Sequence, residues 1–152
     1  VFAAASLAYQ GRPPYLLDIQ TVPHDDDHVV ALFKEGDRWG AISKTNHTIL
    51  RWRDPVYKTP RELAMSYFHE YIVADGEKTM RAFSKPFDLS RYAPEWVVAE
   101  EDLVDIICDL DDSPHYPIAD KAAMKNLRWA QPIEAKVLDI TEWNKAGKKR
   151  KL

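Results

Sequence analysis

The segment HVVALFKEGDRWGAIS, residues 28–43, constrains the fold of this chain more than any other. Its first half alternates, so that His28, Val30 and Leu32 share one face of a strand. The Glu-Gly-Asp sequence at 35–37 supplies turn chemistry, and RWGAIS has the composition of a return strand. The pattern therefore predicts an antiparallel β-hairpin.

A helix and a strand are predicted before this hairpin. The alanine-rich segment VFAAASLAYQG indicates a buried helix that stops at Gly11, because glycine is favoured just beyond a helix end. The following Arg-Pro-Pro prevents further helix, and YLLDIQT then indicates a short buried strand. Two or three strands packed on an alanine-rich helix form the first predicted module.

Three more helices are predicted after the hairpin. In TPREL, Thr59 is the expected N-cap, Pro60 the first helical residue and Glu62 its capping-box partner. Its expected apolar stripe is Leu63, Ala64, Tyr67, Phe68 and Tyr71. A helix within AEEDLVDIICDLDD should face inward with Leu103, Ile106, Ile107 and Leu110. The last predicted helix lies in IADKAAMKNLRW.

These elements predict one α+β domain over residues 1–144: a small antiparallel sheet packed on a buried Ala-rich helix with additional outer helices. Of 152 residues, 45% are hydrophobic and 30% charged, which is typical of a globular chain. The segment 145–152, KAGKKRKL, holds five of the 21 Lys and Arg residues and is predicted to be a flexible basic tail. A net charge of −3 argues against nucleic-acid binding by the body, although the tail could contact RNA or an acidic partner.

The single cysteine, Cys108, excludes an intrachain disulfide. This fits a reducing compartment, so an intracellular, cytoplasmic location is expected, with an organellar one left open because the N-terminus that would carry a targeting signal is missing. Cys108 is expected to be buried among the apolar residues of its helix. No apolar run reaches the roughly 18 residues that span a bilayer, so no membrane insertion is expected.

His28 is the first candidate for chemistry, because either register of the hairpin gives it a polar neighbour. A two-residue turn at Glu35 and Gly36 would place His28 opposite Ser43. A three-residue loop would place it opposite Lys44, with Asn46 on the same face. A histidine held by a third residue provides two parts of a nucleophilic triad, and the missing part is a thiol or hydroxyl at a helix N-terminus.

The acidic residues before His28 have two interpretations. Residues 25–27 are all Asp, and with His24 and His28 they could suggest a metal site. Consecutive residues rarely converge on one ion, so we expect a solvated turn, no metal and no cofactor. Acids held close to His28 would favour its charged form, as a thiolate–imidazolium pair requires.

Several blocks resemble a family of uncharacterised transglutaminase-like proteins, mainly bacterial. They are DDDHVVALF, RWGAISKTNH, LRWRDPVYKTPRELAMSYFHEY and GEKTMRAFSKPFDLS, and the resemblance spans roughly residues 1–117. It implies the papain-like fold of the cysteine peptidase superfamily, with a nucleophilic Cys at the start of the first helix. The Gly-x-Pro strand entry would be residues 11–13 and the aromatic marker Trp39. His28 would be the base, oriented by Ser43 or Asn46.

This chain departs from that family at the nucleophile. The family's Cys precedes the segment that matches VFAAAS, and Ser6 lies too far along the helix to replace it. One hypothesis is a thiol-dependent peptidase, amidase or transglutaminase relative whose Cys lies upstream of Val1 and whose substrate is a peptide or protein. The other is a non-catalytic pseudoenzyme that holds a protein partner in a larger assembly. Whether the chain is an enzyme therefore stays open at this point.

Overall fold

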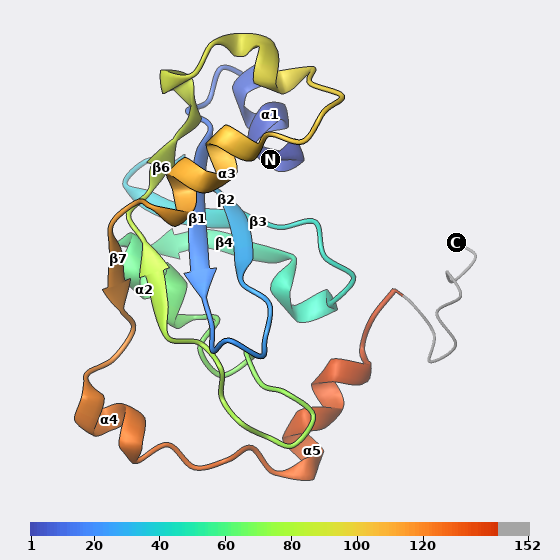
Figure 1. Ribbon diagram of the computed structural model, residues 1–152, viewed down its shortest axis with the longest axis vertical. Coiled ribbons are helices and arrows are strands. Elements are labelled where there is room, and N and C mark those ends of the chain that lie inside the picture. Colours follow the sequence, from blue (N-terminus) through green and yellow to red (C-terminus); the bar gives the residue numbers. More distant parts are fainter. Residues whose placement is uncertain (143–152) are drawn as a thin grey trace.

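Seven strands form one antiparallel sheet, in the order β4-β3-β2-β1-β5-β7, and β6 also pairs with β1 (Figure 1). The computed structural model describes residues 1–142. Its strands are β1 Tyr15–Gln20, β2 His28–Glu35, β3 Arg38–Ile42, β4 Trp52–Tyr57, β5 Ala82–Ser84, β6 Phe87–Asp88 and β7 His115–Pro117. The architecture is α+β, and the predicted hairpin is its β2–β3 pair.

Short helices surround the sheet. The α-helices are α1 Phe2–Tyr9, α2 Pro60–Met65, α3 Val104–Asp111, α4 Lys121–Lys125 and α5 Pro132–Ala135. The 3₁₀ helices are η1 Thr48–Leu50, η2 Leu89–Arg91, η3 Pro94–Val97 and η4 Lys136–Asp139. In Figure 1, α1 and α3 lie at the upper part of the sheet, whereas α4 and α5 lie at the opposite end.

Alternation in the central strands divides the core into two clusters, one on each face of the sheet. The α2-side cluster comprises Leu17, Ile19, Val30, Leu32, Ala41, Leu63, Ala64, Tyr67, Phe68, Tyr71, Met80, Phe83 and Ile118. The α1-side cluster comprises Ala4, Leu7, Leu16, Ala31, Phe33, Phe87, Leu89, Trp96, Ile106 and Leu110. Helix α1 therefore covers one face of β2, and α2 with the segment after it covers the other.

The helix ends follow the local signals in the sequence. Gly11 has φ +73°, and the backbone N–H groups of Gly11 and Arg12 donate to the carbonyls of Ala8 and Leu7, which is the Schellman arrangement. At α2, Thr59 Oγ1 accepts from the Glu62 backbone N–H at 3.1 Å, as predicted. The Glu62 carboxylate accepts from Lys58 N rather than from Thr59 N, so the capping box is shifted by one residue.

Two predictions for α3 were wrong. Ile106 and Leu110 are buried as predicted, but Ile107 is 48% exposed and Cys108 is exposed. Because α3 lies along the edge of the α1-side cluster, only one narrow face of the helix meets the core. Cys108 is therefore a surface thiol and not a small core residue.

Other elements were missed or lie outside the described residues. Pro55 does not end the β-forming segment, because β4 is an edge strand and can accommodate proline. Strands β5 to β7 were not predicted at all. The predicted basic tail, 145–152, lies outside the described residues.

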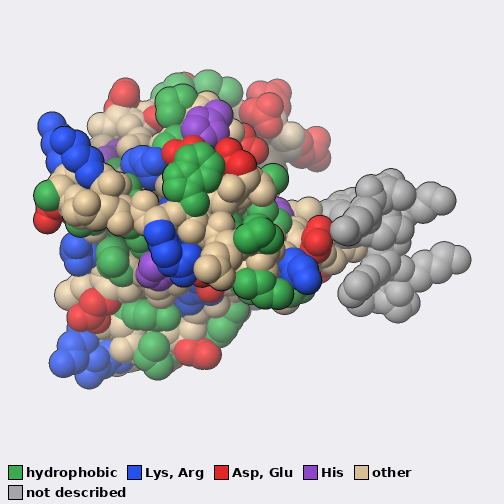
Figure 2. Space-filling model, turned by 90° about the horizontal axis from the view of Figure 1, so that it is seen from below, with side chains coloured by type: hydrophobic (Ala, Val, Ile, Leu, Met, Phe, Trp, Pro, Cys, Tyr) green, Lys and Arg blue, Asp and Glu red, His purple; other side chains and the backbone are tan. Residues whose placement is uncertain are grey.

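The lower end of the molecule carries interspersed charges of both signs, with apolar side chains between them (Figure 2). On the face seen there, Lys and Arg side chains do not gather into one continuous patch. Among residues 1–142, no helix combines the length and the apolar character that a bilayer crossing requires.

Candidate functional site

The β2–β3 turn consists of Gly36 and Asp37, so both predicted registers were wrong. Glu35 pairs with Arg38, and pairing ends at Ala31 with Ile42. Gly36 has φ +59°, which suits the glycine that a type II′ turn requires at its first central position. No residue of β3 lies directly opposite His28 as a result, and the chain after Ile42 is free to approach the imidazole from the side.

The structure nevertheless brings His28 and Ser43 together. Nε2 of His28 and Oγ of Ser43 are 2.6 Å apart, and Ser43 is buried. The Ser43 backbone N–H donates to the Arg51 carbonyl at 2.9 Å, which anchors the serine against the start of β4. The second ring nitrogen, Nδ1, has no hydrogen bond to any described residue.

Asn46, the other predicted orienting residue, forms no hydrogen bond with His28. Its backbone carbonyl accepts from the Glu142 N–H at 2.9 Å, and its half-buried side chain lines a cavity that His28 also lines. The structure thus separates the two candidates: Ser43 holds the imidazole, whereas Asn46 forms part of the surrounding wall.

The aspartates before His28 are not among the causes that shift its pKa. Burial, and secondly the nearby His47, lowers the pKa of His28 below its ordinary value of 6.5. Two of the aspartates accept hydrogen bonds from threonines instead. Asp27 Oδ1 accepts from the Thr21 backbone N–H at 2.7 Å, and Asp25 accepts from the Thr79 hydroxyl. His28 is therefore a neutral imidazole at pH 7, which suits a general base.

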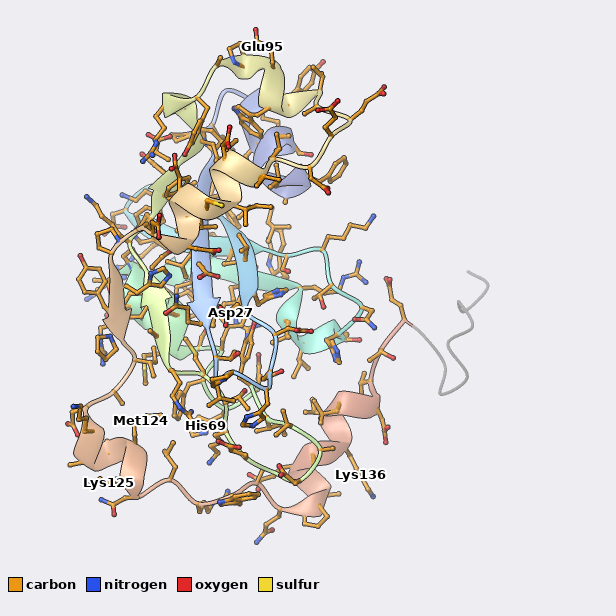
Figure 3. All side chains as sticks on the ribbon, in the orientation of Figure 1. Asp27, His69, Glu95, Met124, Lys125 and Lys136 are labelled. Carbon is orange, nitrogen blue, oxygen red and sulfur yellow. The ribbon has the colours of Figure 1, made fainter. Side chains whose placement is uncertain are left out.

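The loop before His28 also has no metal-binding arrangement. Nε2 of His24 lies 3.0 Å from Oε2 of Glu77, so the His24 side chain pairs with that carboxylate. Within residues 1–142, no three His, Cys, Asp or Glu side chains converge as metal ligands. Asp27, labelled in Figure 3, marks the end of the loop directly before His28.

A cavity of about 290 Å³ opens beside His28. Its lining is Asp25, Asp26, Asp27, His28, Thr45, Asn46, His47, Ile49, Leu50, Glu70, Tyr71, Ile72, Val137 and Leu138. Val137 and Leu138 of this lining belong to η4. The chain reaches the cavity there because residues 136–142 pass over the η1 segment, where the Thr48 N–H donates to the Ile140 carbonyl at 3.2 Å. The cavity is large enough for one side chain or a small acyl group.

An ionic and aromatic group supports the wall of this cavity and was not predicted from the sequence. Arg53 is ion-paired with Glu70, and its guanidinium carbon lies 3.9 Å from the centroid of the Tyr67 ring. Burial raises the pKa of Glu70, while Arg53 opposes this rise. Next to it, the Tyr71 ring lies 6.3 Å from that of His28, between centroids. This group holds the segment after α2 against the site.

Helix α1 reaches the site only at the end of the sheet. His28 shares a face of β2 with Val30, whose side chain belongs to the α2-side cluster, whereas α1 covers the face of Ala31. However, Phe2 and Ser43 line one cavity of about 720 Å³. The first turn of α1 and Ser43 therefore line one cavity near the end of β3, whereas His28 does not line it.

A second histidine–carboxylate pair lies elsewhere in the sheet and was also missed. Asp18 of β1 is buried, and its Oδ2 lies 3.1 Å from Nε2 of His115 at the start of β7. The other ring nitrogen, Nδ1, lies 2.7 Å from the Ser113 carbonyl, so it must donate. Burial raises the pKa of Asp18, and its hydrogen bond with His115 opposes this. Neither Asp18 nor His115 lines the cavity beside His28, and we assign this pair to sheet stability.

Neither a scan of protein-family models nor a search of curated proteins gives a match for this chain.

Proposed function

We propose that this domain is a transglutaminase-like, thiol-dependent acyl-transfer or amide-hydrolysing unit in which His28 is the general base. The observation that carries the proposal is the 2.6 Å contact between His28 Nε2 and Ser43 Oγ, beside a cavity. With Nε2–H donating to Ser43, Nδ1 keeps its lone pair and faces a reactant. A base oriented by a third residue is the arrangement that nucleophilic catalysis uses.

The nucleophile in this proposal is a Cys that precedes Val1. Phe2 begins α1 and lines the same cavity as Ser43, and Lys44 Nζ lies 6.0 Å from the centroid of the Phe2 ring. An α-helix rises about 1.5 Å per residue, so one further turn toward the N-terminus would extend about 5.4 Å beyond Phe2. A thiol at such a helix start has a lowered pKa, because the positive end of the helix dipole stabilises the thiolate.

The reaction follows from these positions. The thiol gives its proton to His28 Nδ1, and the thiolate attacks the carbonyl carbon of an amide. The imidazolium returns the proton to the departing amine as the C–N bond breaks, which leaves a thioester. Water or a second amine, deprotonated by His28, then attacks the thioester and releases the thiol. A neutral His28 at pH 7 is the protonation state with which this cycle starts.

The alternative is a non-catalytic module that keeps the fold and holds a protein partner. It is favoured by the position of His28 on the face of β2 that α1 does not cover. A nucleophile on α1 must reach the imidazole around the end of β3 and not directly across the helix–sheet interface. In the non-catalytic case, the same cavity would receive a side chain of the partner.

The test uses the full-length product of the gene, whatever residues it carries before Val1. Alkylation by iodoacetamide at pH 7, followed residue by residue with mass spectrometry, should label a Cys within about ten residues upstream of Val1, or about 15 Å of helix. That labelling should be at least about tenfold faster than labelling of the exposed Cys108. His28→Gln should slow it about tenfold or more, because the base is lost.

His24→Gln is the matched control, since His24 is exposed and pairs with Glu77 rather than with Ser43. It should leave both labelling rates unchanged. An upstream segment without Cys, or one whose Cys reacts no faster than Cys108, would overturn the catalytic proposal and leave the non-catalytic module.

A further inference from the structure

Helix α3 carries apolar side chains on two faces. Ile106 and Leu110 are buried in the α1-side cluster, whereas Val104 is 58% exposed and Ile107 48% exposed. Val104, Ile107 and the exposed Cys108 occupy positions i, i+3 and i+4, so they form one outward stripe. A helix needs only one apolar face to pack on its own core, and a second one is typical of a surface that binds a partner.

A shallow groove continues this stripe. It has a volume of about 400 Å³ and lies between η3 and the start of α3. Trp96 of η3 and Leu103 line its apolar part, and Val104 belongs to both the groove and the stripe. In Figure 1, α3 crosses the sheet with its outer face uncovered, and the η3 segment arches above it. We call the groove and the stripe together the η3–α3 surface.

Acidic residues border the η3–α3 surface. Glu95, Asp102 and Asp105 line the groove, and none of them forms an ion pair with another described residue. Residues 95–112 contain no Lys or Arg, and their eight acids are Glu95, Glu100, Glu101, Asp102, Asp105, Asp109, Asp111 and Asp112. Among the described ion pairs, only Asp109 of these eight has a partner, Arg91. The surface therefore combines apolar contact area with a strong negative field.

We propose that the η3–α3 surface binds a basic amphipathic helix of a partner protein. Its apolar residues would enter the groove and cover Val104 and Ile107, while its Lys and Arg side chains would face Asp102 and Asp105. Nucleic acid and anionic lipid are repelled by the same carboxylates. A second copy of this chain, paired through the same surface, would bring two acidic borders together. Charge complementarity thus selects a cationic occupant, independently of the chemistry at His28.

The experiment measures binding of a fluorescent synthetic peptide to the full chain. The peptide has Leu at positions i, i+3, i+4 and i+7 and Lys elsewhere, and a scrambled peptide of the same composition serves as its comparison. We expect the amphipathic peptide to bind at least about tenfold more tightly than the scrambled one. The double variant Val104→Ser/Ile107→Ser should weaken binding about tenfold or more. Asp102→Lys/Asp105→Lys should do the same and reduce the dependence on salt.

The matched controls are Ile133→Ser, an exposed apolar residue on α5, and Asp26→Lys, an exposed acid beside His28. Both should leave the peptide affinity within about twofold, and circular dichroism should show that all variants are folded. Equal binding of the scrambled peptide, or an equal loss in the control variants, would overturn the proposal. Dimerisation of the chain that Val104→Ser/Ile107→Ser abolishes, seen by sedimentation, would also overturn it in favour of a second copy.

Discussion

At the scale of single residues, the candidate site depends on one short contact between two side chains. Ser43 is buried and anchored through its backbone, so it can hold the His28 ring in one orientation. Asn46 lines the cavity and forms no hydrogen bond with the ring. The two residues that the sequence left as alternatives therefore have different expected effects on substitution.

Ser43→Ala should destabilise the fold by about 1–3 kcal/mol, because it leaves a partly buried ring nitrogen without a hydrogen bond. Asn46→Ala should cost less than about 1 kcal/mol, since the backbone carbonyl that accepts from Glu142 remains. Urea unfolding of the two variants beside the unsubstituted chain checks this difference. Equal losses would show that Ser43 does not hold the imidazole in solution.

The lowered pKa of His28 predicts a pH dependence of stability. In the unfolded chain the imidazole titrates near its ordinary value of 6.5, and in the folded protein it titrates lower. As pH falls below 6.5, the unfolded state takes up the proton first, so the free energy of unfolding should fall until the folded-state pKa is passed. Denaturant unfolding from pH 7.5 to pH 4.5 should show this loss.

His28→Gln should remove this contribution, so its stability should change less with pH across that interval than that of the unsubstituted chain. His24→Gln provides the comparison, because that exposed residue pairs with Glu77 at the surface. An unchanged pH profile in His28→Gln would contradict a depressed His28 pKa.

At the scale of elements, one pair connects strands that are not neighbours. Asp18 lies on β1 and His115 on β7, with β5 between them. Nδ1 of His115 must donate to the Ser113 carbonyl, so Nε2 and the Asp18 carboxyl share a proton between them. Ser84 of β5 completes the group, since its Oγ accepts from Asp18 N at 2.9 Å.

Asp18→Ala should therefore cost about 1–3 kcal/mol, because it leaves the part-buried Nε2 of His115 without its hydrogen-bond partner. Asp18→Asn should cost clearly less, because the side-chain amide can donate a hydrogen bond to Nε2 of His115. Thermal and urea unfolding of both variants measure the difference. Equal destabilisation by Ala and Asn would mean that volume, and not the hydrogen bond to β7, sets the cost.

At the scale of the whole molecule, local sequence signals predicted the elements and missed how distant ones meet. Alternation located β2, and the Gly11 and Thr59 signals located two helix ends, because these depend on neighbouring residues. Strands β5 to β7 have only two or three residues each and exist through pairing with distant strands. Short segments of this kind have no period that a sequence can show.

The candidate site divides in the same way. His28 and Ser43 were predicted as neighbours because they are close in the hairpin, even though its register was wrong. Asp18 and His115 lie 97 positions apart, and Arg53 meets Glu70 only because the segment after α2 folds back on β4. Pairs of this kind depend on the tertiary fold, and no local pattern marks them.

The arrangement of contacts over the whole molecule predicts a hierarchy of stability. The β1–β2 pair lies between two buried clusters, whereas residues 136–142 belong to neither cluster and contact the η1 region through hydrogen bonds and the exposed Arg51–Glu142 ion pair. The η4 segment should therefore open locally without unfolding of the sheet.

In native-state hydrogen exchange, the amides of Thr48 and Glu142 should exchange by local opening, at a free energy well below that of Leu17 and Val30. Since Val137 and Leu138 line the His28 cavity, such opening would widen access to the imidazole without global unfolding. Increasing urea should accelerate exchange at Leu17 but barely change it at Glu142. Equal protection and equal urea dependence at all four amides would instead show that η4 is an integral part of the cooperative unit, and that the cavity opens only when the domain unfolds.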